Sequence, residues 1–216
     1  MSQTLQAVIW DFGGVLTSSP FEAFTRYEAA NGLPKDFIRG VNARNGDTNA
    51  WAKLERSEID ADGFDLLFRE EARAMGHNVP GRDVLSLLAG DLRGGVVEAL
   101  KVCKSRVKVG CITNNAKIGK GASMTDNAAR AKAAGEVLAL FDHVIESSKV
   151  GVRKPDPRIY EMMCETLEVD PAACVYLDDL GINLKPARAM GMTTIKVTGE
   201  AQLLEDLRAA TGFTDL

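Results

Sequence analysis

The chain has 216 residues, a length that suits one globular core with an inserted cap better than two full domains. Hydrophobic residues make up 45% of the chain and charged residues 26%, which is typical of a folded protein and argues against intrinsic disorder. The formal net charge is -4, and the lysines and arginines are scattered rather than clustered, which argues against a nucleic-acid-binding surface.

The cysteines and the N-terminus bear on where the protein works. No CxxC spacing joins the four cysteines, so we expect buried free thiols in a reducing compartment; they are Cys103, Cys111, Cys164 and Cys174. The first residues lack the basic start and apolar core of a signal peptide, and no run approaches the ~18 apolar residues of a membrane span. We therefore expect a cytoplasmic protein, monomer or homodimer, without a membrane or nucleic-acid partner.

The first predicted element is a buried strand over residues 7–10, which ends at Asp11. About ninety residues separate it from the next strand, residues 107–112, although a simple crossover needs only about a dozen. Four helical patterns fill the interval, over residues 21–31, 48–56, 60–75 and 82–88. Ser57 or Asp60 could cap the N-terminus of the third of these helices. Such an insertion would stand over the carboxyl ends of the strands, where open α/β sheets bind ligands.

After residue 107, strand and helix patterns alternate. Residues 114–141 begin with Gly and Lys punctuation, which predicts a loop near the ligand, and end in an alanine-rich helix pattern. The remaining strands are predicted at residues 144–145, 174–177 and 193–197, and the remaining helices at residues 158–167, 184–190 and 201–210. This alternation favours a doubly wound α/β sheet with right-handed crossovers.

Polar residues follow the first two strands at the point where each ends. Asp11 follows the first strand, and Thr113, Asn114 and Asn115 follow the second. A hydroxyl and successive backbone N–H groups at a strand end suit phosphate oxygens. Taken alone, Asp11 also fits a strand-ending turn, and Thr113 an ordinary strand-end residue.

The third and fourth strands are followed by charged residues. Lys154 stands in a run stiffened by Pro155 and Pro157, where an ammonium group could neutralise both an aspartate and a bound anion. Asp178 and Asp179 are adjacent at the end of the fourth strand, and such a pair repels itself unless a cation compensates. A hard ion such as Mg²⁺ takes carboxylate, carbonyl and water oxygens, so the sequence predicts a Mg²⁺ site here.

Together these motifs resemble the haloacid dehalogenase-like hydrolase superfamily. Four matching motifs come in order along nearly the whole chain: Asp11 with the following GVLT, Thr113, Lys154 in RKPDP, and Asp178-Asp179. The stretches VIESSKVGVRKPDPRIY and VYLDDLGINLKPARAMGMTTIKV are similar to the N-terminal phosphatase-like domain of soluble epoxide hydrolase and to the hydrolase-like domain of some acyl-CoA dehydrogenases. The resemblance implies a Rossmann-like α/β sheet of order 3-2-1-4-5, with a core over residues 1–17 and 96–216 and a helical cap over residues 18–95.

The resemblance also implies roles for single residues. Asp11 would attack phosphorus and form an aspartyl-phosphate. Mg²⁺ would be held by Asp11, Asp178 and the carbonyl of Gly13, with Asp179 orienting a metal-bound water. The residues expected to hold phosphate oxygens or contact the substrate are Thr113, Lys154, Gly14, Asn114 and Asn115.

Gly13 departs from the superfamily pattern, in which an aspartate two residues after the nucleophile serves as the acid and base. Losing that group costs a factor of about 10²–10⁴ in rate. We therefore expect a Mg²⁺-dependent phosphatase that acts on a small phosphorylated metabolite with reduced catalytic efficiency. A 2-haloacid dehalogenase is the first alternative, because its attack on carbon needs no such acid. A non-catalytic module that binds a phosphorylated ligand or a partner is the second.

The cap would choose the substrate, and its sequence says little about how. Arg44, Asn45, Trp51 and Lys53 are candidates to face the pocket. A tryptophan on a helix is more often part of a core than a ligand contact.

Overall fold

The computed structural model describes residues 4–115 and 128–216 of the chain. Its centre is a five-stranded sheet of order β3-β2-β1-β4-β5 in which every pairing is parallel. This is the predicted order 3-2-1-4-5, and it confirms the Rossmann-like α/β fold. The strands are β1 (Ala7–Trp10), β2 (Lys108–Thr113), β3 (His143–Glu146), β4 (Cys174–Asp178) and β5 (Thr193–Lys196).

The register of the sheet sets which side chains meet at its carboxyl edge. Trp10, the last residue of β1, lies opposite Cys111 of β2 and Leu177 of β4. The residues that come next in each strand therefore emerge together at one edge, with Asp11 in the middle.

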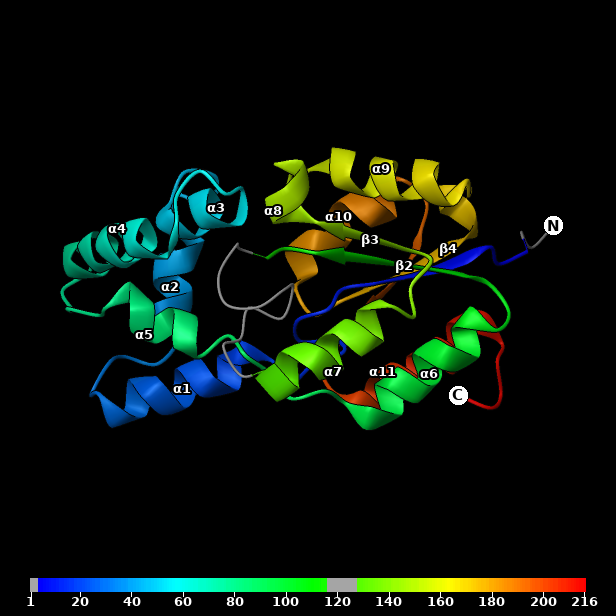
Figure 1. Ribbon diagram of the computed structural model, residues 1–216, viewed down its shortest axis with the longest axis horizontal. Coiled ribbons are helices and arrows are strands. Elements are labelled where there is room, and N and C mark those ends of the chain that lie inside the picture. Colours follow the sequence, from blue (N-terminus) through cyan, green and yellow to red (C-terminus); the bar gives the residue numbers. More distant parts are fainter. Residues whose placement is uncertain (1–3, 116–127) are drawn as a thin grey trace.

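Two layers of helices cover the sheet (Figure 1). One face packs on α6, α7 and α11 and the other on α9 and α10, each through its own apolar cluster. Both faces being buried explains why the strands read as continuous apolar runs. These helices, with the short α8 and a 3-10 turn, are α6 (Gly94–Lys104), α7 (Ala128–Leu138), α8 (Ser147–Val150), α9 (Pro157–Leu167), η2 (Pro171–Ala173), α10 (Gly181–Ala189) and α11 (Glu200–Thr211).

The long insertion forms a separate helical cap beside the sheet (Figure 1). Its five helices enclose a hydrophobic cluster of their own, built around Phe64 and Phe68. The two connections to the core run side by side and meet at an antiparallel bridge between Thr17 and Leu92. The cap helices are α1 (Pro20–Ala30), α2 (Phe37–Ala43), α3 (Ala50–Glu55), α4 (Ala61–Ala74) and α5 (Gly81–Ser86).

Local capping explains where the predicted cap helices begin. Asp60 caps α4 by accepting a hydrogen bond from the Gly63 N–H at 2.8 Å, so of the two candidates for this cap Asp60 is the correct one. Helix α2 is not predicted from the sequence, because it is short and contains Gly40. A distant carboxylate supports its start, because Glu28 accepts the N–H of Ile38 at 2.9 Å.

Two sequence expectations concern the region after β2 and the cysteines. The alanine-rich helix is confirmed as α7, whereas the predicted glycine-containing loop lies largely outside the described residues. All four cysteines are buried free thiols, as expected. Within the described part of the chain, every helix is too short or too polar to cross a membrane.

Candidate active site

Lys154 is the centre of a buried charged cluster at the carboxyl edge of the sheet. Its Nζ lies 2.8 Å from Asp11 Oδ1 and 2.8 Å from Asp178 Oδ2, and it donates to the Ile112 carbonyl at 2.9 Å. Lys154 is 1% exposed, Asp178 0% and Asp11 7%, so water solvates these charges very little. The structure thus brings together the ends of β1, β2 and β4 through one ammonium group.

Burial and neighbouring charges shift the pKa values of this cluster. Burial raises the pKa of Asp11 well above its usual value; Lys154 opposes the shift, and the charges of Asp178 and Asp179 add to it. Burial by itself would lower the pKa of Lys154, but the two carboxylates outweigh it, so the net shift is upward. Lys154 therefore stays cationic and stabilises the charged form of the buried Asp11.

Asp178 is held in place by hydrogen bonds to both of its carboxylate oxygens. Oδ2 accepts from Lys154 and from the Tyr176 hydroxyl at 2.6 Å, and Oδ1 accepts from the Leu180 N–H at 2.8 Å. The Asn183 side-chain amide adds contacts of 3.0 and 3.1 Å. These contacts fix the Asp178 carboxylate in place and tie it to Lys154.

Asp179 faces the cavity above the sheet, whereas Asp178 lies buried beneath it. Burial, followed by the charge of Asp178, raises the pKa of Asp179 to about 6. Gly14 makes room for this side chain: a Cβ at Gly14 would lie 2.3 Å from Asp179 Oδ2, and its φ of 77° disfavours other residues. Of the two adjacent carboxylates, Asp179 is therefore the one that lines the cavity, and Asp178 is the one buried beneath it.

The acidic cluster fits a divalent metal ion. Asp11, Asp178 and Asp179 each offer a carboxylate oxygen, and these atoms lie within 4.8 Å of one another. Lys154 forms ion pairs with Asp11 and Asp178, so the three carboxylates carry more negative charge than this one ammonium group offsets. Hard oxygen donors with excess negative charge are what Mg²⁺ and similar ions bind. Gly13 also lies on the cavity wall, and a Cβ there would meet nothing within 4 Å.

The three residues predicted after β2 have different positions. Thr113 and Asn114 line the cavity. Asn114 also holds Lys154: its Oδ1 accepts the Lys154 N–H at 2.8 Å, and its Nδ2 donates to the Lys154 carbonyl at 3.0 Å. The expectation that Asn115 contacts the substrate is not supported, because its Nδ2 donates to Glu146 at 2.7 Å and its N–H donates to the Ser147 hydroxyl.

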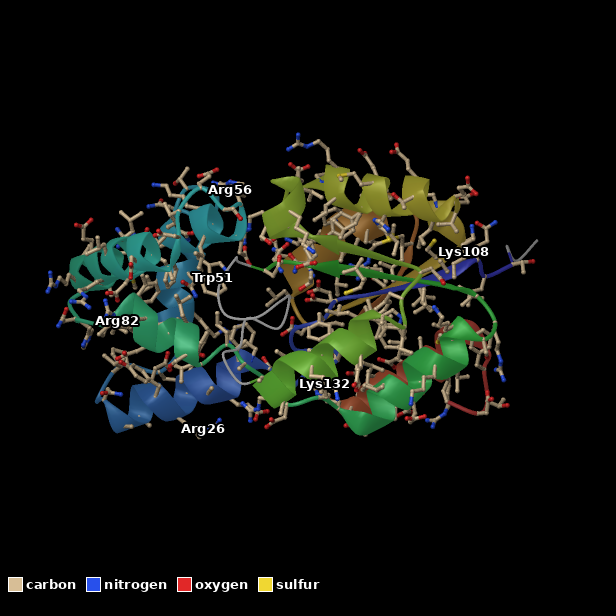
Figure 2. The ribbon with its side chains drawn as sticks, viewed as in Figure 1. Arg26, Trp51, Arg56, Arg82, Lys108 and Lys132 are labelled. Carbon is tan, nitrogen blue, oxygen red and sulfur yellow. The ribbon has the colours of Figure 1, made fainter. Side chains whose placement is uncertain are left out.

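A cavity of about 910 Å³ lies above this cluster, between the cap and the core. Aromatic and apolar cap residues line much of it, including Phe21, Phe24 and Trp51. Trp51 is on the side of the cap that faces the sheet (Figure 2). Of the four cap residues singled out from the sequence, Trp51 is on the wall, and Arg44, Asn45 and Lys53 are not among the described lining residues.

Three residues important to this geometry had no predicted role. Tyr176 reads as an apolar strand residue, yet its hydroxyl holds Asp178. Arg153 precedes Lys154 and reaches the cap residue Glu55, a contact 98 residues apart in sequence. Asn183 holds the Asp178 carboxylate through its side-chain amide. Its position at the start of α10, five residues after Asp178, is the one sequence signal that could have indicated this contact.

The chain is similar to known proteins over nearly its whole length. The chain is 33% identical to bifunctional epoxide hydrolase 2 of Mus musculus over 96% of its length, and 30% identical to acyl-CoA dehydrogenase family member 10 of the same species over 98%. It spans only 39% and 20% of those two longer proteins. A phosphatase of Mycobacterium tuberculosis, MT3486, is 27% identical and matches over 92% of this chain and 90% of its own.

Solved structures share the fold at lower identity. An L-2-haloacid dehalogenase of Xanthobacter autotrophicus with chloropropionic acid covalently bound matches 96% of this chain and 84% of its own, with a TM-score of 0.60 and 18% identity. A haloacid dehalogenase family enzyme of Bacteroides thetaiotaomicron, in complex with magnesium and inorganic phosphate, matches 91% of this chain and 96% of its own, with a TM-score of 0.57 and 19% identity. The sequence model of the haloacid dehalogenase-like hydrolase family matches residues 5–191, and the chain belongs to this family.

Proposed function

We propose that the protein is a Mg²⁺-dependent phosphatase that releases inorganic phosphate from a small phosphorylated metabolite, with Asp11 as the nucleophile. The observation that carries the proposal is the buried pair of Asp11 and Lys154 beneath the cavity, 2.8 Å apart, with Asp179 on the cavity wall. A buried cation beside the carboxylate offsets the repulsion between that carboxylate and a phosphate dianion. The relatedness to a protein named as a phosphatase supports the same conclusion.

In the proposed reaction, a carboxylate oxygen of Asp11 attacks phosphorus in line with the ester oxygen. The bond between phosphorus and that oxygen breaks, and the alcohol leaves with a proton taken from water or from the substrate itself. Water then attacks the phosphorus of the aspartyl-phosphate, which regenerates the Asp11 carboxylate and releases phosphate. Dividing the hydrolysis into two displacements lowers the barrier of each.

The phosphate oxygens need cationic and hydrogen-bonding partners as charge redistributes. The Lys154 ammonium and the Thr113 hydroxyl, both at the cavity, would hold two of them, and the Asn114 amide keeps Lys154 in position. Bound Mg²⁺, held by Asp11, Asp179 and the Gly13 carbonyl, would offset the charge between nucleophile and phosphate.

Gly13 sets the expected efficiency. Without an acid at this position, nothing at residue 13 protonates the leaving oxygen, and the loss of a general acid costs about 10²–10⁴ in rate. Substrates with good leaving groups should therefore be hydrolysed best.

The test is phosphate release from p-nitrophenyl phosphate and from acetyl phosphate, with Mg²⁺ and with chelator. We expect Mg²⁺-dependent turnover that Asp11→Asn abolishes while its thermal unfolding stays cooperative. The proposal fails when release is undetectable with Mg²⁺, or when Asp11→Asn retains full activity.

The same material distinguishes the alternatives. Chloride release from L-2-chloropropionate without metal would indicate a dehalogenase, for which Gly13 is no obstacle because attack on carbon needs no acid. Binding of inorganic phosphate without turnover of any ester would indicate a ligand-binding module.

A further inference from the structure

A buried ion pair joins the cap to the core directly beside Lys154. Arg153, the residue before Lys154, donates through Nε to the carboxylate of Glu55, the last residue of the cap helix α3. The Arg153 side chain is 17% exposed and that of Glu55 6%. Burial raises the pKa of Glu55, and the charge of Arg153 opposes that shift. Two poorly solvated charges of this kind stabilise each other only while the cap and core remain together.

Further hydrogen bonds cross between the cap and the core at the same place. Arg153 Nη1 donates to the Gly46 carbonyl in the cap at 3.0 Å. The Ser147 hydroxyl of the core donates to the Glu55 carbonyl at 3.0 Å, and the Ser57 hydroxyl of the cap donates to the Ser148 carbonyl at 3.0 Å. The contacts therefore concentrate where α3 meets α8.

The backbone at Lys154 is fixed from both sides. On the core side, the Asn114 side chain bonds the Lys154 N–H and carbonyl at 2.8 and 3.0 Å. On the cap side, the preceding residue, Arg153, is tied to Glu55 and Gly46. A movement of the cap at α3 would consequently pull on the segment that carries the Lys154 ammonium.

We propose that Glu55 and Arg153 are positioning residues, whose ion pair fastens the cap over the cavity and sets the Lys154 segment at the same time. Both side chains also line the cavity, so the pair forms part of its wall. This inference concerns the placement of the cap and holds for any reaction at Asp11.

The test compares Glu55→Gln, Arg153→Gln and the double variant by acrylamide quenching of tryptophan fluorescence. The chain has two tryptophans, and because Trp10 is 0% exposed, the change reports Trp51 on α3. We expect stronger quenching in each single variant. The double variant should be quenched no more than the stronger single variant, because both changes remove the Arg153–Glu55 ion pair and only Arg153→Gln also removes the Gly46 contact.

Arg56→Gln is the matched control. Arg56 pairs with Glu58 at 2.6 Å within the cap and reaches no core residue through that pair, so its loss should leave quenching unchanged. Where p-nitrophenyl phosphate is hydrolysed, kcat/KM should fall about 10²-fold in the Glu55 and Arg153 variants, since a displacement of about 1 Å of a catalytic group has that effect. KM should rise along with the fall in kcat, because the cavity wall changes too.

The inference is overturned when folded Glu55→Gln and Arg153→Gln quench like the unmodified protein, or when their effects on quenching add. Should both fail to fold, Arg153→Lys keeps the positive charge but cannot hold Glu55 and Gly46 together. Unchanged quenching in that variant refutes the inference equally. Quenching needs no substrate, so this outcome is separate from the success or failure of the proposed phosphatase activity.

Discussion

Replacing Lys154 by methionine tests the electrostatic account of the site most directly. The ammonium lies 2.8 Å from both Asp11 and Asp178, and all three groups are nearly inaccessible to water. Removing one partner of a buried ion pair leaves uncompensated charge and costs about 3–5 kcal/mol in free energy of unfolding. Typical domains have only about 5–15 kcal/mol in total, so the variant should fold with a much reduced stability.

The pH dependence of this loss follows from the pKa of Asp11. Burial already raises that pKa in the folded protein, and without Lys154 the opposing charge is gone, so the pKa rises further. An acid with a raised folded pKa binds its proton more tightly when folded, so its contribution to stability is lost as pH rises through that value. The deficit of Lys154→Met should therefore be smaller near pH 5 than at pH 8.

Urea denaturation at the two pH values measures the effect, with Lys101→Met as the control. Lys101 pairs with Glu98 on the surface, where the two side chains are 50% and 70% exposed. Such exposed pairs contribute about 0.2–1 kcal/mol. A deficit for Lys154→Met as small as that of the control, or one that does not change with pH, would refute the reasoning.

Three further outcomes follow from the same geometry. Gly14→Ala should weaken Mg²⁺ binding measured by calorimetry, because the added Cβ would lie 2.3 Å from Asp179 Oδ2. Gly13→Ala is the control and should bind Mg²⁺ normally, because a Cβ at Gly13 meets nothing within 4 Å. Equal Mg²⁺ affinity in the two variants would contradict the packing argument. Gly13→Asp should raise turnover of alkyl phosphates by about 10²-fold, and unchanged turnover in a folded variant counts against a missing acid. Mg²⁺ affinity should fall about tenfold per pH unit below the Asp179 pKa of about 6, since proton and metal compete for that carboxylate; a flat profile from pH 5 to 7 would exclude Asp179 as a ligand.

The amino-acid sequence determined the fold and the membership of the charged cluster. Short apolar runs ending in Asp11, Thr113 and the Asp178-Asp179 pair fix a parallel sheet whose carboxyl edge collects those residues. The sequence alone predicts this arrangement because parallel strands that are buried on both faces must be short, continuous apolar runs, and because the carboxyl ends of such strands emerge at one edge of the sheet.

The tertiary structure decided what each member of the cluster does. Asp178 and Asp179 are adjacent in sequence, but one is sealed beneath the cavity by Tyr176 and Asn183 and the other faces the cavity. In the same way, Asn115 is occupied by Glu146 on a neighbouring strand. The pairing of Glu55 with Arg153 joins residues 98 positions apart. Sequence spacing cannot specify such contacts, because successive side chains at a strand end diverge and their partners come from elements that only folding brings together.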